Sequence, residues 1–217
     1  MLKKLSQESI RTILETGIAE FAQSGSDKAS MSAIARKSGV SVGVIYKYFE
    51  NKDTFFIACL RHALTALEEA IDEAMSGEAR LLIRAEKLIR ALQKSAKTQR
   101  DYHVLYHEIT AGSCRKYAPM LAREIEGISA KAYTAYIASA QKRGEVRSDM
   151  SPRLFAFFFD NLLMMLQFSY CCDYYRARFR IYCGDEIFDA DEKIVAELLK
   201  FLESAFTTEH AQIPHNI

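Results

Sequence analysis

The side chains with the most evident binding chemistry lie in residues 30–52. From residue 30 to residue 49 the chain carries hydroxyl, phenol and ammonium groups and no carboxylate. Up to Lys52 there are eight basic residues against five acidic ones, although the formal net charge of the whole chain is only +1. Donors of this kind bind phosphate oxygens and base edges. The pattern therefore predicts an anion-binding segment near the N-terminus.

Two short helices are predicted to hold these donors. One covers residues 31–37 and is capped by Ser30, and the other covers residues 42–49 and is capped by Ser41. Gly39, in the turn between them, allows the left-handed conformation that often ends a helix. A set of apolar side chains is expected to face inward and fix the two helices together: Ile34, Ala35, Val40, Ile45 and Phe49.

Longer helices are predicted on both sides of this pair. One runs from Ser6 to Gln23 and is ended by Gly25, and another starts at Lys52, after the cap Asn51, and continues into the 70s. This division predicts a small helix-turn-helix domain over residues 1–50 and a larger helical domain over residues 51–217. The helix at about 52–75 links the two. Further amphipathic helices are expected at Glu78–Thr98, Tyr102–Ala111, Ala118–Arg143, Pro152–Tyr175 and Asp189–Phe206.

Several spaced elements in this window resemble the signature of the TetR family of transcriptional regulators. They are Ile34-Ala35, Gly39-Val40-Ser41, Gly43, Ile45-Tyr46, Tyr48-Phe49 and Lys52. The resemblance covers about the first quarter of the chain. It implies an all-α fold, with an N-terminal three-helix helix-turn-helix domain followed by a larger helical effector-binding and dimerisation domain. It also implies a homodimer that binds a palindromic double-stranded DNA operator and represses transcription.

The resemblance also implies which residues contact DNA. Tyr46 and Tyr48 match positions that touch phosphates or base edges, and Lys52 matches a lysine that contacts a phosphate at a helix N-terminus. The whole set is Ser30, Ser32, Ser41, Val42, Gly43, Val44, Tyr46, Lys47, Tyr48 and Lys52. Because Gly43 and Val44 cannot form a bidentate bond to a base, we expect Lys47, Tyr46, thymine-methyl contacts and DNA shape to carry much of the discrimination.

In the second domain, the family resemblance implies a cavity for a small-molecule effector. Aromatic and methionine side chains suit a hydrophobic or aromatic ligand, and the candidates are Tyr102, Tyr106, Phe155, Phe159, Asp160, Met164 and Phe168. Plain core packing is the alternative for each of them. Asp160 and Asn161 interrupt an apolar run. The alternatives for them are binding of an effector's polar group, an internal hydrogen-bond network, or an exposed position near the dimer axis.

The last two long helices, about 152–175 and 189–206, are expected to form the homodimer interface as a four-helix bundle. The intervening residues, rich in tyrosine and arginine, are interpreted as a surface loop that lies at the rim of the interface or covers the pocket. His103 and His107 have the spacing of a metal pair, but a third ligand is not fixed. No metal and no cofactor are predicted.

The sequence disfavours other classes of protein. It has no nucleophile elbow, phosphate loop, dinucleotide fingerprint or zinc-protease motif, so an enzyme is not expected. A helical scaffold that does not bind DNA stays as the remaining alternative. The N-terminus lacks an apolar signal region, and the longest apolar stretch is interrupted by Asp160 and Asn161. We therefore expect no membrane partner and a cytoplasmic location.

Overall fold

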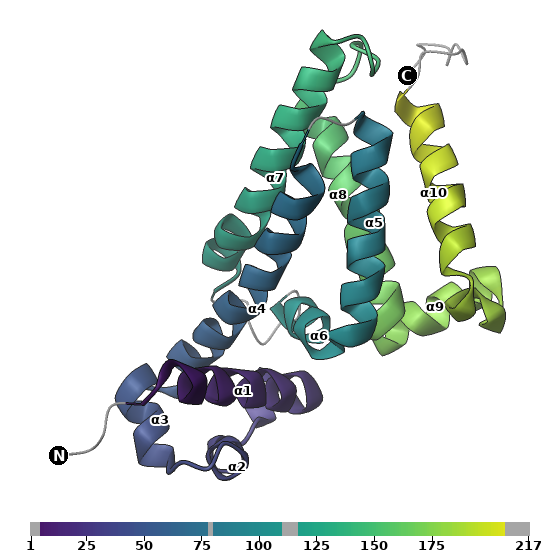
Figure 1. The fold of residues 1–217 in the computed structure, drawn as a ribbon. Coiled ribbons are helices and arrows are strands. Elements are labelled where there is room, and N and C mark those ends of the chain that lie inside the picture. Colours follow the sequence, from purple (N-terminus) through teal and green to yellow (C-terminus); the bar gives the residue numbers. More distant parts are fainter. Residues whose placement is uncertain (1–4, 78–79, 110–116, 207–217) are drawn as a thin grey trace.

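The computed structural model describes residues 5–77, 80–109 and 117–206, and these residues form helices and no strand. Figure 1 shows a small N-terminal unit at one end of the molecule and a larger group of long helices above it. The elements are α1 Gln7–Lys28, α2 Met31–Lys37, α3 Val42–Phe49, α4 Lys52–Met75, α5 Leu81–Thr98, α6 Arg100–Ile109, α7 Ala118–Lys142, α8 Pro152–Cys171, α9 Asp173–Cys183, the 3-10 turn η2 Asp185–Asp189 and α10 Asp191–Phe206.

The N-terminal unit packs around an apolar core that continues into α6 and α7. Helices α1, α2 and α3 pack with the first turns of α4 around fully buried side chains, among them Ile13, Phe21, Ile34, Ile45 and Phe55. The edge of the Phe21 ring contacts the Phe56 ring, with 5.0 Å between centroids, a favourable geometry for aromatic pairs. This packing fixes α2 and α3 relative to α1 and α4.

The larger domain is built on the long helices α4, α5, α7 and α8. Helix α4 belongs to both domains, because it starts in the N-terminal unit and then runs between α5 and α7 (Figure 1). Helix α10 packs on α5, and α9 joins the lower ends of α8 and α10. By length and composition α8 is apolar enough to cross a membrane, but more than half of its apolar window is buried inside the protein. That burial is typical of a core helix.

Most predicted helix boundaries in the N-terminal domain are confirmed. Helices α2, α3 and the start of α4 lie where the caps placed them. The first helix is longer than predicted: Gly25 takes a φ of 75°, but it forms a kink, and helical turns continue to Lys28. The predicted helix ends at Glu78 and Ala111 lie outside the described residues.

The prediction of a surface loop between the last two long helices is wrong. Helix α8 ends at Cys171 instead of Tyr175, and the tyrosine- and arginine-rich stretch forms α9 and η2. The break occurs at Cys172, whose backbone is extended (φ −100°, ψ 129°). The Arg176 guanidinium donates to the Tyr170 carbonyl across this break and also lies over the Phe188 ring. These tertiary contacts stabilise α9 in a new direction.

Candidate nucleic-acid interface and effector cavity

Three N-terminal caps set the geometry of the helix-turn-helix. Ser30 Oγ accepts from the Ala33 amide at 3.2 Å, and Ser41 Oγ accepts from the Val44 amide at 3.3 Å. Asn51 and Thr54 form a reciprocal capping box at the start of α4. Each cap satisfies an amide that the helix leaves without an internal partner. The two serines therefore start α2 and α3 in addition to any contact they make with DNA.

Helix α3 presents a polar outer face. Ile45 is fully buried beneath it, whereas Ser41, Gly43, Tyr46 and Lys47 are exposed. Ser32 on α2 and Ser30 before it are exposed as well, and the remaining predicted DNA contacts are partly exposed: Val42, Val44, Tyr48 and Lys52. The structure thus brings all ten predicted residues to the surface at the end of the molecule farthest from α10 (Figure 1).

Tyr48 and Lys52 also hold the N-terminal unit together. The Leu5 amide donates to the Tyr48 hydroxyl at 2.7 Å, and Lys52 Nζ donates to the Asp27 carbonyl at 2.7 Å. The first bond fixes the chain before α1, and the second fixes the end of α1 against α4. The phosphate contacts predicted for Tyr48 and Lys52 would therefore depend on where the two ends of α1 lie.

Glu20 is a supporting residue that the sequence analysis did not find. Its carboxylate accepts from the Ser30 amide at 3.2 Å and from Lys37 Nζ at 3.0 Å. The hydrogen bond from Lys37, followed by the one from Ser30, lowers the pKa of the Glu20 carboxyl below its usual value. The carboxylate thereby ties both ends of α2 to α1. A lone buried glutamate in an amphipathic helix gave no signal of this role.

The larger domain encloses two small adjoining cavities between α4 and α8. The first has a volume of about 40 Å³ and the second about 30 Å³, so each has room for about one or two water molecules. Four side chains line both cavities and separate them: Leu67, Leu92, Tyr106 and Gln167. A drug-sized ligand needs several hundred Å³. It could be accommodated only if these four side chains moved and the cavities merged.

The predicted effector residues are divided among four places. Tyr102 and Tyr106 line the first cavity, and Tyr106, Asp160 and Met164 line the second. The remaining three lie elsewhere. Phe155 and Phe159 line a groove beside α10, where Phe155 stacks on Phe206, and Phe168 packs against the rings of Tyr106, His107 and Tyr175.

The second cavity has a polar, acidic side. Asp160 of α8 and Glu126 of α7 both line it, and Glu126 Oε1 accepts from the Tyr106 hydroxyl at 2.7 Å. Burial, and then the nearby charge of Glu126, raises the pKa of Asp160 to about 6. Its neighbour Asn161 lies in the groove beside α10 and donates to the Phe157 carbonyl at 2.7 Å. The two adjacent polar residues therefore serve different surfaces.

The two histidines have different surroundings. His103 is buried, its Nε2 lies 2.9 Å from Ser95 Oγ, and burial lowers its pKa to about 4. The imidazole of His107 packs against the rings of Phe168 and Tyr175. Across the described ranges, no group of three or more His, Cys, Asp or Glu side chains is arranged to hold a metal ion.

A hydrogen-bonded bridge connects the first cavity to the DNA-binding unit. The Tyr102 hydroxyl donates to Glu15 Oε1 of α1 at 2.6 Å, and His62 Nε2 of α4 lies 3.0 Å from the same oxygen. Although burial raises the pKa of Glu15, the hydrogen bonds from Tyr102 and His62 lower it below the usual value. Glu108 of α6 also accepts from the Ser26 amide of α1 at 3.4 Å. Helix α6 therefore contacts α1 at two polar points, a link that no sequence pattern predicted.

A capped helix-turn-helix joined through one long helix to a cavity-containing helical domain defines a class, the ligand-sensing DNA-binding regulators. The comparisons agree with this class. Residues 13–59 match the family described as "Bacterial regulatory proteins, tetR family". The "Probable acrEF/envCD operon repressor" of Escherichia coli (strain K12) is 31% identical over 163 residues, which cover 69% of this chain and 71% of that protein. The chain belongs to the TetR family and is a DNA-binding transcriptional regulator.

Solved structures show the same fold. The regulator FadR from Bacillus subtilis, in complex with stearoyl-CoA, aligns with a TM-score of 0.71 at 17% identity, covering 91% of this chain and 100% of that one. FadR from Bacillus halodurans aligns with a TM-score of 0.67 at 18% identity, covering 91% and 96%. At these identities the likeness establishes the architecture, and the ligand of this protein has to be argued from its own residues.

Proposed function

We propose that this protein is a homodimeric, cytoplasmic repressor that leaves a palindromic operator when a small apolar effector enters the larger domain. The observation that carries this proposal is the position of Tyr102. One side of this residue lines the first cavity, and its hydroxyl binds Glu15 of α1. A ligand that displaces Tyr102 therefore acts directly on the helix that supports the DNA-binding unit.

The DNA-binding step uses the exposed face of α3. A short recognition helix reads few bases, so two copies related by a two-fold axis read two half-sites about one helical turn apart. Exposed Tyr46 and Lys47 supply hydrogen bonds, and the flanking serines and Lys52 supply phosphate contacts. Dimerisation through α8 and α10 sets the distance between the two recognition helices.

The release step is a shift between two populations. An effector acts only through the difference in its affinity for the operator-competent and operator-incompetent arrangements. The two cavities are small and share a partition, so a ligand that fills both displaces the partition side chains, among them Tyr106 of α6. Since α6 also holds α1, this displacement changes the orientation of α3. The stearoyl-CoA bound by the FadR neighbour supports an effector with a large apolar part.

Selection of genomic fragments by the purified protein tests the DNA-binding half of this proposal. We expect enrichment of one palindromic site, with affinity that falls steeply as salt rises because phosphate-bound counterions are released. Lys47→Ala should bind that site at least about tenfold more weakly, and with less preference among bases, if Lys47 reads a base edge. A scaffold that does not bind DNA would enrich no site at low salt, and an unchanged preference in Lys47→Ala would remove that lysine from the reading surface.

Tyr102→Phe tests the link between the domains. The variant keeps the ring in the cavity and loses only the bond to Glu15, so the DNA-binding unit samples more orientations. A hydrogen bond to a charged group contributes about 1.5 kcal/mol, so operator affinity should fall by about tenfold. The matched control is Tyr106→Phe, which loses a bond to Glu126 within the larger domain. Equal losses in both variants, measured by fluorescence anisotropy, would show that Tyr102 has no special coupling role.

A further inference from the structure

The second cavity combines negative charge with an open hydrogen-bonding group. Glu126 approaches from α7 and Asp160 from α8. None of the described lysines or arginines forms an ion pair with either carboxylate, whereas several exposed acids elsewhere on the chain have such partners. Carboxylates removed from water are costly unless a positive charge or several donors face them. Among the described residues, Tyr106 donates to Glu126 and Ser129 to Asp160, and no cationic side chain pairs with either acid.

Tyr133 is a second, independent feature that points to a ligand site in this cavity. The residue is only 4% exposed, and it lines the same cavity as the two acids. Its ring packs edge-on against Phe159 with 5.3 Å between centroids. Its hydroxyl forms no hydrogen bond with any residue in the described part of the chain. Buried polar groups rarely stay without a partner, so the hydroxyl is available to a bound molecule.

The other walls of the cavity are apolar. Helices α4 and α5 contribute Leu67, Ile71 and Leu92, and α8 contributes Leu163 and Met164. The first cavity continues this apolar surface with side chains of α4, beyond the Tyr106 and Leu92 partition. An occupant that fits both ends has a charged or polar head near Asp160 and an apolar body that extends toward α4. Aromatic faces beside a cation add a favourable electrostatic contact.

We propose that the effector is a lipophilic organic cation, whose positive charge lies between Asp160 and Glu126 and whose apolar body fills the merged cavities. This inference rests on the proposed effector-controlled function and names the ligand class of the same cavity. Tyr133 and Tyr106 border the charged head, and the leucines of α4 and α5 surround the body. An acyl-CoA, whose head is anionic, places the opposite charge at this site.

Two pairs of probes with matched shape and opposite charge test the inference. They are tetraphenylphosphonium against tetraphenylborate, and decyltrimethylammonium against decyl sulfate, each below micelle-forming concentration. In calorimetry on the full-length dimer, at least one cation should bind at least about tenfold more tightly than its matched anion, as expected for a charge pair in a partly buried site. The same cation should release the operator fragment. If neither cation binds more tightly than its anion, the inference is wrong.

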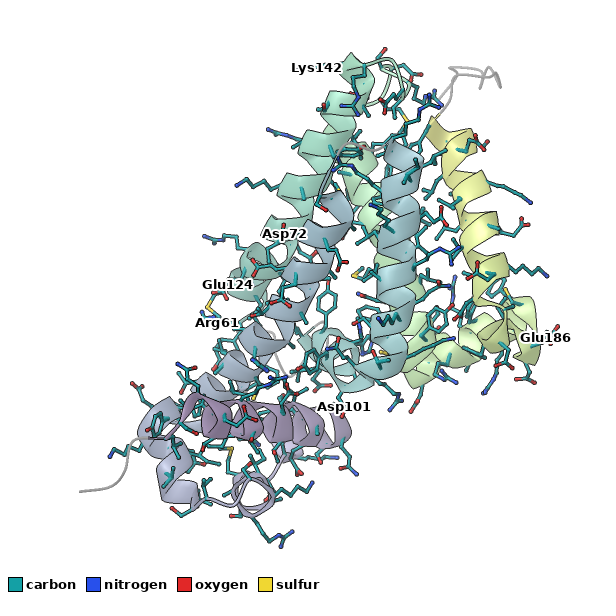
Figure 2. The ribbon with its side chains drawn as sticks, in the orientation of Figure 1. Arg61, Asp72, Asp101, Glu124, Lys142 and Glu186 are labelled. Carbon is teal, nitrogen blue, oxygen red and sulfur yellow. The ribbon has the colours of Figure 1, made fainter. Side chains whose placement is uncertain are left out.

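Variants separate this site from non-specific attraction. Asp160→Asn and Glu126→Gln keep the cavity shape and should each weaken cation binding by about tenfold or more. Asp72→Asn is the control, because this exposed acid of α4 lies on the outer surface of the molecule (Figure 2). Retention of full cation affinity in both cavity variants would overturn the inference. Release of the operator by stearoyl-CoA but by no cation would reject the ligand class and keep the repressor function.

The pH dependence provides a second readout. Asp160 has a raised pKa of about 6, so it carries its charge above that pH and loses it below. Affinity for the permanent cation should rise by about tenfold from pH 5 to pH 7.5 and then level off. Facing groups are Glu126 and Tyr133 from α7 and Tyr106 from α6, while α4 and α5 present apolar side chains. His103 nearby stays neutral over this range, and Asp160→Asn should abolish the rise.

Discussion

Replacing Phe158 with glutamate will convert the dimer to a monomer and lower operator affinity by about a hundredfold or more. Two linked binding modules exceed the affinity of one by about 10²–10⁴, and a monomer presents a single recognition helix to a two-part operator. The expected loss is therefore larger than for any single contact made by α3.

The reason lies in the surface formed by α8 and α10. Phe158 is 53% exposed, and Leu154, Phe157 and Phe201 are also exposed large apolar side chains. An apolar groove of about 490 Å³ runs between the two helices, lined by Phe155, Phe158, Phe201 and their neighbours. Exposed apolar surface of this extent marks an interface, and helices of the two protomers can bury it by forming a four-helix bundle. A glutamate in the centre of that bundle would have no partner.

Sedimentation and operator binding, measured on the same preparations, check this prediction. Ile83→Glu is the matched control, since Ile83 is 48% exposed on α5 and does not line the groove. It should remain dimeric and bind the operator normally. A dimeric Phe158→Glu protein would move the interface away from this face of α8.

The sequence predicted the DNA-binding unit well because the signals there are local. The caps Ser30, Ser41 and Asn51 each act within three residues, and they place the starts of α2, α3 and α4 correctly. The inward positions of Ile34 and Ile45 follow from helical periodicity alone. Such features need no knowledge of the rest of the chain.

The arrangement of the larger domain depends on long-range contacts that the sequence pattern does not specify. Helix α8 is apolar on nearly all sides, so its pattern could not distinguish Asp160, which lines the cavity, from Asn161 and Phe155, which line the groove. The break at Cys172 has no glycine or proline to signal it, and a contact of Arg176 with the Tyr170 carbonyl supports it. Likewise, the bond from Tyr102 to Glu15 joins residues 87 positions apart.

Gly17 is the position where the smallest change should have the largest effect on stability. This helical glycine lies where α1 crosses α4, and an added Cβ would stand 2.5 Å from Phe55 Cζ and 2.7 Å from Cys59 Sγ. Both neighbours are fully buried in the core of the DNA-binding unit, so neither can move aside freely. Overpacking of a close-packed core lowers the free energy of unfolding by about 1–3 kcal/mol. Gly17→Ala should therefore destabilise the protein, although alanine favours helix by about 1 kcal/mol.

A second helical glycine supplies the control for this argument. Gly127 is exposed on α7, and a Cβ added there meets no atom within 4 Å. Gly127→Ala has the same gain in helix propensity without the collision, so urea denaturation should show it to be more stable than the parent by up to about 1 kcal/mol. The difference in sign between the two variants isolates the contact between α1 and α4. Combining Gly17→Ala with Phe55→Leu, which removes the nearest ring atom, should recover part of the loss because the two sites are in contact. If Gly17→Ala were as stabilising as Gly127→Ala, α1 would not be held against α4 at this distance.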